Sequence, residues 1–298
     1  MEQIELFYKA GKKCENDGDN KIREDILAKV ITTPLEYLED PTYGDKWRQV
    51  QTGWLEVLKG LYNNTTTFDT LNIIKMAGRG HNYDFEAHYK TNGEVVQKEN
   101  IEFKYNSVSL DKIPQFLQLH ENVGFLKVSY AEFYYDNYLS KHIENIPLLE
   151  LIEKEVYLKN IKNVNYNCNS FFAKLKAAEE DRSAKVAIDK LVKESISDYL
   201  SNYGKDIDLD VLKVRLAAQT RKVFVMWKSG NFSNDKISIG TQLEYKGIKN
   251  NNTIVVEDVE RLQEYHLLLR WKNHKGVLNP AWQISLHKGL TLAKKLVK

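Results

Sequence analysis

The chain has 298 residues, 42% of them hydrophobic, and its 43 Lys and Arg nearly balance 41 Asp and Glu. This size and apolar content suffice for one large domain or two ordinary ones, and 15 Gly and 5 Pro exclude a low-complexity chain. No apolar run approaches the roughly 18–20 residues that span a bilayer, and the first 20 residues lack the apolar core of a secretory signal. Two cysteines cannot build a disulfide framework. We therefore expect a soluble intracellular protein without membrane contact, in the cytoplasm or, if viral, in the nucleus of a host cell.

Charge is unevenly distributed along the chain. Residues 211–298 contain 16 Lys and Arg and 6 Asp and Glu, a net charge of +10, so residues 1–210 carry −8. A basic C-terminal third predicts a polyanionic partner that is contacted mainly from that end. Basic segments also solubilise many proteins, so charge alone leaves both interpretations open.

Hydrophobic periodicity predicts the secondary structure of the N-terminal half. Helices are expected at residues 21–39 and 46–62, and strands at 71–76, 83–89 and 95–105. The last two strands are separated by Asn92-Gly93, the residue pair that most strongly favours a two-residue β-hairpin turn. Pro114 is expected to open a helix, because proline is tolerated in a first helical turn.

The second half is expected to be helical first and β-rich afterwards. Ile188 to Leu200 give a stripe of period 3.6 that ends at Gly204, and an aromatic cluster at 130–138 is predicted to be core. Strand patterns follow at 222–228, 237–245, 253–256, 265–272 and 281–286. We therefore expect three regions, an N-terminal core at 1–125, a helical insertion at 126–205, and a β-rich part at 206–298.

The chemistry predicted from the sequence centres on the hairpin. Glu102 and Lys104 are two residues apart on a strand, so they project to the same side. Asp84 begins the partner strand, and the hairpin can return it beside Glu102. Two adjacent carboxylates favour a hard cation, Mg²⁺ or Mn²⁺, which polarises a phosphate and activates a bound water. Lys104 can then stabilise negative charge on the phosphate. The alternative is a solvated hairpin whose Glu and Lys form a surface pair. Glu-x-Lys alone is not specific, because any charged strand produces it and Glu244 to Lys246 is a second example.

The order helix, strand, Asp-bearing strand, turn, Glu-x-Lys strand and helix resembles the PD-(D/E)XK nuclease superfamily over residues 46–120. This resemblance implies a restriction-endonuclease-like α/β core, in which a small mixed sheet is flanked by helices. It also implies that Asp84 and Glu102 are metal ligands and that Lys104 is the catalytic lysine. The proline that precedes the Asp in the family is replaced by Tyr83. The fourth core strand could be residues 223–227 or 267–271.

Further residues are candidates by position. Glu56 in the second helix matches a carboxylate that many members of the superfamily use as a further metal ligand, although it could equally be solvated. Gln115 and Gln118 follow the motif, where related nucleases often place a Gln near the phosphate. Arg79 and His81, between and after two glycines, could contact phosphate.

The basic C-terminal third supplies the remaining candidates for DNA binding. Arg270 and Lys272 are expected on the face of a strand opposite Leu269 and Trp271, with Lys275 in the following loop. An alternative path for the DNA runs along four basic residues. These are Arg215, Arg221, Lys222 and Lys228.

We therefore expect a Mg²⁺- or Mn²⁺-dependent endonuclease that hydrolyses DNA, a site-specific enzyme of restriction or homing type. Its partner would be duplex DNA, and two-strand cutting favours a homodimer, although a monomer remains open. Two alternatives remain: an RNA or structure-specific nuclease of the same fold, and a nucleic-acid-binding protein without catalysis.

Overall fold

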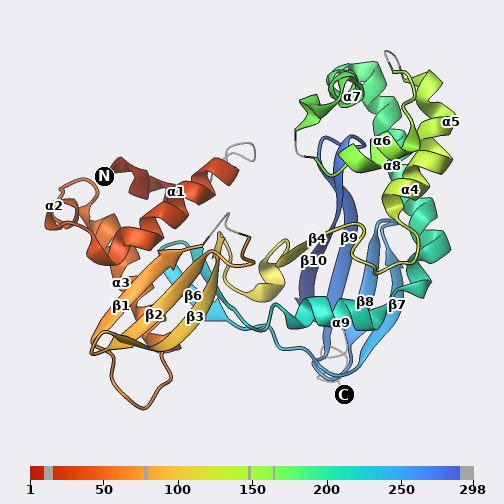
Figure 1. The fold of residues 1–298 in the computed structure, drawn as a ribbon. Helices are drawn as coiled ribbons and strands as arrows, with labels where there is room; N and C mark the ends of the chain where they lie inside the picture. Colours follow the sequence, from red (N-terminus) through yellow and green to blue (C-terminus); the bar gives the residue numbers. More distant parts are fainter. Residues whose placement is uncertain (10–15, 77–79, 147–148, 164, 289–298) are drawn as a thin grey trace, which may run out of the picture. The chain divides into compact units, whose positions relative to one another are not determined.

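The computed structural model describes residues 1–9, 16–76, 80–146, 149–163 and 165–288, and it is a mixed α/β structure (Figure 1). The chain divides into two units. Unit 1 comprises Met1–Ile113 and Ala218–Ser238, and unit 2 comprises Pro114–Ala217 and the described residues from Ile239 on. Each unit contains one five-stranded sheet. The first boundary therefore falls after Ile113 instead of residue 125, and the expected segment 206–298 is divided between the units.

Unit 1 contains three α-helices and one sheet among its described residues. The helices are α1 (Asn16–Lys29), α2 (Leu35–Leu38) and α3 (Gly44–Leu61). The strands are β1 (Thr70–Lys75), β2 (Phe85–Thr91), β3 (Glu94–Tyr105), β5 (Val223–Lys228) and β6 (Asn231–Asp235). Their order in the sheet is β1-β2-β3-β5-β6, and only β3 and β5 are parallel neighbours. Residues 106–222 supply the crossover that parallel pairing requires, and they include the first segment of unit 2.

The core of unit 1 lies between α3 and one face of the sheet. Trp47, Val50, Trp54 and Leu58 recur at helical spacing and are buried. They belong to the same core as alternate residues of the hairpin strands, and the rings of Trp54 and Phe85 lie 5.8 Å apart. The alternation of β2 and β3 therefore commits one face of the hairpin to the core and leaves the other face for polar side chains.

Unit 2 contains six α-helices and the second sheet within its described part. The helices are α4 (Tyr130–Tyr134), α5 (Ser140–His142), α6 (Lys154–Asn160), α7 (Ser170–Glu180), α8 (Arg182–Tyr203) and α9 (Leu209–Ala217). The strands are β4 (Leu117–His120), β7 (Leu243–Lys249), β8 (Thr253–Asp258), β9 (Gln263–Asn273) and β10 (Leu278–Lys288). They are antiparallel, in the order β4-β10-β9-β8-β7.

The aromatic cluster at 130–138 is buried core, as its spacing predicts. The hydroxyl of Tyr130 lies 2.9 Å from Oγ of Ser195 on α8 and accepts a hydrogen bond from Nε1 of Trp271 on β9. Leu269 and Trp271 are buried and Arg270 and Lys272 are exposed, so the predicted division of this strand into two faces is confirmed.

Three predicted elements differ from the structure. The helix expected at 21–39 ends at Lys29, and after a short 3₁₀ turn Pro34 separates it from α2. The helix expected after Pro114 was wrong, because residues 117–120 pair with β10 as the edge strand β4. The strand at 237–245 was also wrong over most of its length. There the amide of Gly240 donates to Asp258 and that of Thr241 to Glu260, so side chains take the hydrogen bonds that a strand would need.

Within the described part of the chain, none of the helices combines the length and the hydropathy that crossing a membrane requires.

Candidate active site

Asp84 and Glu102 face each other at one end of the hairpin. The ladder pairs Phe85 with Ile101, and the amide of Asp84 donates to the carbonyl of Ile101 at 2.8 Å. This register places Asp84 opposite Glu102. Since Phe85 and Ile101 are buried in the core, their neighbours project from the other face of the sheet. Oδ2 of Asp84 also accepts a hydrogen bond of 2.8 Å from the amide of Phe103. The structure therefore brings the two predicted carboxylates together.

The environment of Asp84 disfavours its negative charge. Burial, followed by the nearby charge of Glu102, raises the pKa of Asp84 to about 7, although the hydrogen bond from Phe103 acts in the opposite direction. Glu24 also raises the pKa, and the ammonium of Lys104 lowers it. A carboxyl group that titrates near neutrality beside a second carboxylate is typical of a functional site.

Two lysines bind the carboxylate of Glu102. Nζ of Lys104 lies 2.5 Å from Oε1, as the shared strand face predicts. Nζ of Lys222, which comes directly before β5, lies 3.0 Å from Oε2 and also donates to the main-chain oxygen of Asn82. Burial lowers the pKa of Lys222, and Glu102 opposes this shift. From the sequence, Lys222 was expected only on an alternative DNA path, because no local pattern shows that β5 pairs with β3.

The parallel pairing also answers which later segment adjoins the motif. Residues 223–227 form part of β5 beside β3, whereas residues 267–271 belong to β9 in the sheet of unit 2. Of the two strands considered from sequence, the first is therefore the neighbour of the Glu-x-Lys strand.

The helical carboxylate that acts on Asp84 is Glu24 of α1, not Glu56 of α3. Glu24 is half-buried and its Oε2 lies 3.2 Å from Nζ of Lys75, at the end of β1. Glu56 is exposed and lines a shallow pocket with Gly53 and Phe232. On α3 the core-facing residues are Trp54 and Leu58, so position 56 lies on the opposite side of the helix. The predicted role of Glu56 as a ligand beside Asp84 is therefore not supported.

The donor set fits one hydrated Mg²⁺ or Mn²⁺. Among the described residues, no group of three or more His, Cys, Asp or Glu side chains is arranged to hold a metal ion. Mg²⁺, however, usually keeps several waters and binds through one or two carboxylates together with substrate phosphates. Asp84 and Glu102 provide such a pair, and a cation beside them would oppose the burial and the repulsion from Glu102 that raise the pKa of Asp84.

The loop before β2 and the segment after β3 hold the other candidates. His81 is exposed, and its ring lies 5.2 Å from that of Tyr83. Arg79 lies outside the described residues. Gln115 and Gln118 belong to unit 2, where Gln118 pairs with Gln283 across the ladder of β4 and β10. They therefore do not lie on the helix that the resemblance implied.

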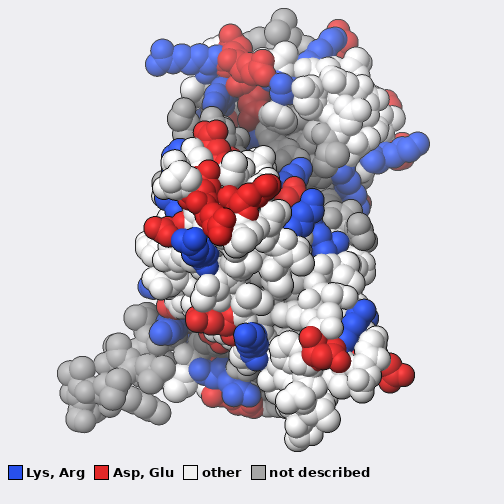
Figure 2. Space-filling model, turned by 90° about the vertical axis from the view of Figure 1, so that its left-hand side faces the viewer, with Lys and Arg blue, Asp and Glu red and all other residues white. Residues whose placement is uncertain are grey.

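The candidate DNA contacts of the C-terminal third also belong to unit 2. Arg270, Lys272 and Lys275 are exposed, and Nζ of Lys275 lies 3.4 Å from Asp189. Counted by folded unit, the charge asymmetry nearly disappears. Unit 1 has 19 Lys and Arg against 20 Asp and Glu, and unit 2 has 24 against 21. On the face shown in Figure 2, acidic side chains gather in one area and basic ones are scattered, so its described part has no continuous basic surface.

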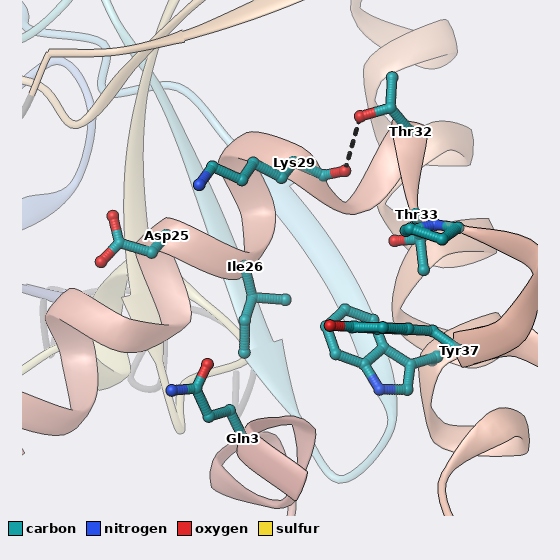
Figure 3. A pocket seen from close by; sticks show the side chains of 9 residues that line it. Gln3, Asp25, Ile26, Lys29, Thr32, Thr33 and Tyr37 are labelled. Atoms are coloured by element: carbon teal, nitrogen blue, oxygen red, sulfur yellow. Dashed lines mark hydrogen bonds between the residues drawn. The ribbon is translucent and has the colours of Figure 1, made fainter. Parts of the chain in front are cut away.

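A pocket of ≈ 370 Å³ lies beside α1 (Figure 3). Ile26 and the ring of Tyr37 form part of its lining, together with the side chains of Gln3 and Lys29. Asp25 connects this pocket to the candidate site, because it binds Nζ of Lys75 at 2.9 Å and the same ammonium binds Glu24. Asp84, Glu102, Lys104 and Lys222 are not among the residues that line this pocket.

Comparisons with protein-family models, with curated proteins and with solved structures found no match for this chain. The likeness to a nuclease therefore depends on the residues and geometry of unit 1 alone.

Proposed function

We propose that the protein is a metal-dependent endonuclease that hydrolyses phosphodiester bonds of DNA at Asp84, Glu102 and Lys104. The observation that supports this proposal is the register of β2 and β3, which sets Asp84 opposite Glu102 with Lys104 bonded to the same carboxylate. A surface hairpin would leave such carboxylates solvated, whereas here burial and mutual repulsion raise the pKa of Asp84.

Each side chain has a task that follows from its position. Asp84 and Glu102 would hold the hydrated Mg²⁺ or Mn²⁺, which when bound polarises the phosphate and lowers the pKa of a water ligand. The oxygen of a water would form a bond to phosphorus while the bond from phosphorus to the 3′-oxygen breaks, and a proton released from that water would end on the 3′-oxygen, leaving 3′-hydroxyl and 5′-phosphate ends. Lys104 exchanges Glu102 for a phosphate oxygen and donates hydrogen bonds to it as negative charge develops there.

Cleavage of plasmid DNA tests the proposal directly. Purified protein is incubated with supercoiled plasmid and Mg²⁺ or Mn²⁺, with parallel reactions in EDTA and with Asp84→Asn protein. We expect metal-dependent cleavage by the wild type and none by the variant. Discrete fragments would indicate a site-specific enzyme, and a smear would indicate non-specific cutting.

Intact plasmid in all reactions would contradict the proposal. A labelled RNA and a branched DNA substrate then distinguish the remaining possibilities, because metal-dependent cleavage of either would indicate a related nuclease with another substrate. Binding without cleavage of any substrate would leave a nucleic-acid-binding protein. Light scattering of the DNA complex shows whether a homodimer cuts the duplex, since two strands require two sites.

A further inference from the structure

Lys222 is drawn into the site by the strand that follows it. The five residues Val223–Trp227 are all buried, so the chain enters the sheet at Lys222 and its side chain is only 4% exposed. Alternation along β5 places Lys222 on the same face as Phe224, and Phe224 pairs with Glu102 in the parallel ladder. Its ammonium accordingly lies over the ring of Phe224, 5.1 Å from the ring centroid, and points toward Glu102.

The ammonium of Lys222 connects two segments of the site. One contact is to Oε2 of Glu102 on β3, at 3.0 Å, and the other is to the main-chain oxygen of Asn82. Asn82 lies two residues before Asp84, in the segment that leads into β2. One buried cation therefore links the loop that carries one carboxylate to the strand that carries the other.

Lys104 differs from Lys222 in exposure. Its side chain is 23% exposed and binds Oε1, the other oxygen of the same carboxylate. Solvent can therefore reach Lys104 when it turns away from Glu102, whereas the nearly buried ammonium of Lys222 would have to give up both of its acceptors to move. Of the two lysines, Lys104 is the one that can move toward a phosphate.

We propose that Lys222 is a positioning residue, whose buried ammonium fixes Glu102 and the Asn82–Asp84 segment so that both carboxylates face one cation. This inference rests on the proposed function, because it assigns the support of the same site. With a cation bound, Glu102 would keep Oε2 on Lys222, and Lys104 would turn away from Oε1 toward the substrate. Hydrogen-bonded partners of metal-ligating carboxylates have this effect in metal sites generally.

Binding of Mn²⁺ without any nucleic acid tests the inference, measured by electron paramagnetic resonance. Lys222→Met keeps the length of the side chain but removes the ammonium, and Lys228→Met is the matched control at the exposed end of the same strand. Lys222→Gln restores a shorter N–H donor. We expect Lys222→Met to weaken Mn²⁺ binding by about 10–100-fold, Lys222→Gln to recover part of the loss, and the control to match wild type.

Unchanged or tighter Mn²⁺ binding by both Lys222 variants would overturn the inference, because removal of a charge alone favours the cation. The Gln variant preserves this test if the Met variant does not fold.

Amide resonances of the metal-free protein separate this inference from the proposed function. Loss of the link should shift the amides of Asn82, Asp84 and Glu102 in Lys222→Met but not in Lys228→Met. Unshifted amides would overturn the inference even if the wild type cuts DNA, whereas shifted amides without Mn²⁺ binding or cleavage by the wild type would refute the proposed function.

Discussion

The two units each contain a strand with Glu-x-Lys, and the two motifs have different surroundings. On β3, Glu102 is 15% exposed and lies between β2 and β5, in the middle of its sheet. On β7, Glu244 and Lys246 are both 44% exposed and lie on an edge strand. Lys246 binds Glu257 of the neighbouring strand at 2.7 Å, so the second motif is a surface ion-pair cluster. The same Glu-x-Lys spacing therefore forms a candidate site only on the strand that has neighbouring strands on both sides.

The largest expected effect on cleavage is the loss of a carboxylate at the β3 site, compared with the loss of Glu244 on β7. Asp84→Asn or Glu102→Gln should reduce metal-dependent cleavage by more than ~100-fold, since loss of a ligand exceeds the ~10–100-fold cost of losing its outer partner. Glu244→Gln should leave the rate unchanged. Initial rates of plasmid cleavage and circular dichroism of each variant provide the measurement. Equal losses in Glu102→Gln and Glu244→Gln would indicate a general folding effect and would contradict the site.

The next effect compares the lysines of the two motifs. Lys104→Ala should lower the cleavage rate by about 10²–10³-fold, because it removes a donor to charge that develops on the phosphate. Binding of DNA should survive, and Lys246→Ala should cut at the wild-type rate. Single-turnover rates with saturating enzyme separate the chemical step from binding. A Lys104→Ala variant that cuts normally would remove this residue from the mechanism.

A third effect concerns pH and the charge of Asp84. Its pKa of about 7 exceeds the ordinary value of ~3.9, so between these values the folded, metal-free protein holds a proton that the unfolded chain has released. The contribution of this group to stability is therefore present below pH ~4 and is lost as pH rises through 7. Thermal unfolding in EDTA should show that Asp84→Asn lacks this decline, relative to wild type. Added Mg²⁺ should raise the Tm more at pH 8 than at pH 5, and an equal rise at both would be evidence against the carboxylate as a ligand.

The smallest effect concerns the basic residues of unit 2. Lys272→Ala combined with Lys275→Ala should weaken DNA binding and reduce the slope of log K against log salt by about 1–2, without lowering the Tm. Fluorescence anisotropy at several salt concentrations measures the slope. The exposed pair Arg221 and Lys228 of unit 1 is the comparison. If the salt slope changes only when Arg221 and Lys228 are replaced by Ala, the DNA lies along unit 1.

The hairpin was predictable because local patterns determine it. Asn92 and Gly93 both have positive φ, 53° and 86°, as the turn signal predicts, and the alternation of β2 and β3 then places Asp84 and Glu102 together. The pairing of a carboxylate with Lys104 requires only the period of a strand. These parts of the site depend on sequence separations of about 20 residues.

Contacts between distant segments were not predictable from local patterns. Lys222 reaches Glu102 across 120 residues, and the identity of the helical carboxylate, Glu24 instead of Glu56, depends on how α1 meets the end of β1. Residues 117–120 were predicted to be helical because Pro114 suits a first helical turn. In the structure they instead form backbone hydrogen bonds with β10 as the edge strand β4. The charge counted along the chain suggested a basic C-terminal region, but unit 1 takes its last two strands from that third, so neither folded unit is strongly basic.

The crossover between β3 and β5 also sets the order of events during synthesis. β3 emerges from the ribosome more than a hundred residues before its parallel neighbour, so one edge of the first sheet stays unpaired while residues 106–222 are made. Lys222 arrives with that neighbour. A truncated chain that stops before β5 would therefore carry the complete Asp84, Glu102 and Lys104 motif without the strand and the cation that complete it. Under the proposed function, a chain released before β5 would lack the support that Lys222 gives to Glu102, so the site would be complete only after about three quarters of the chain had been translated.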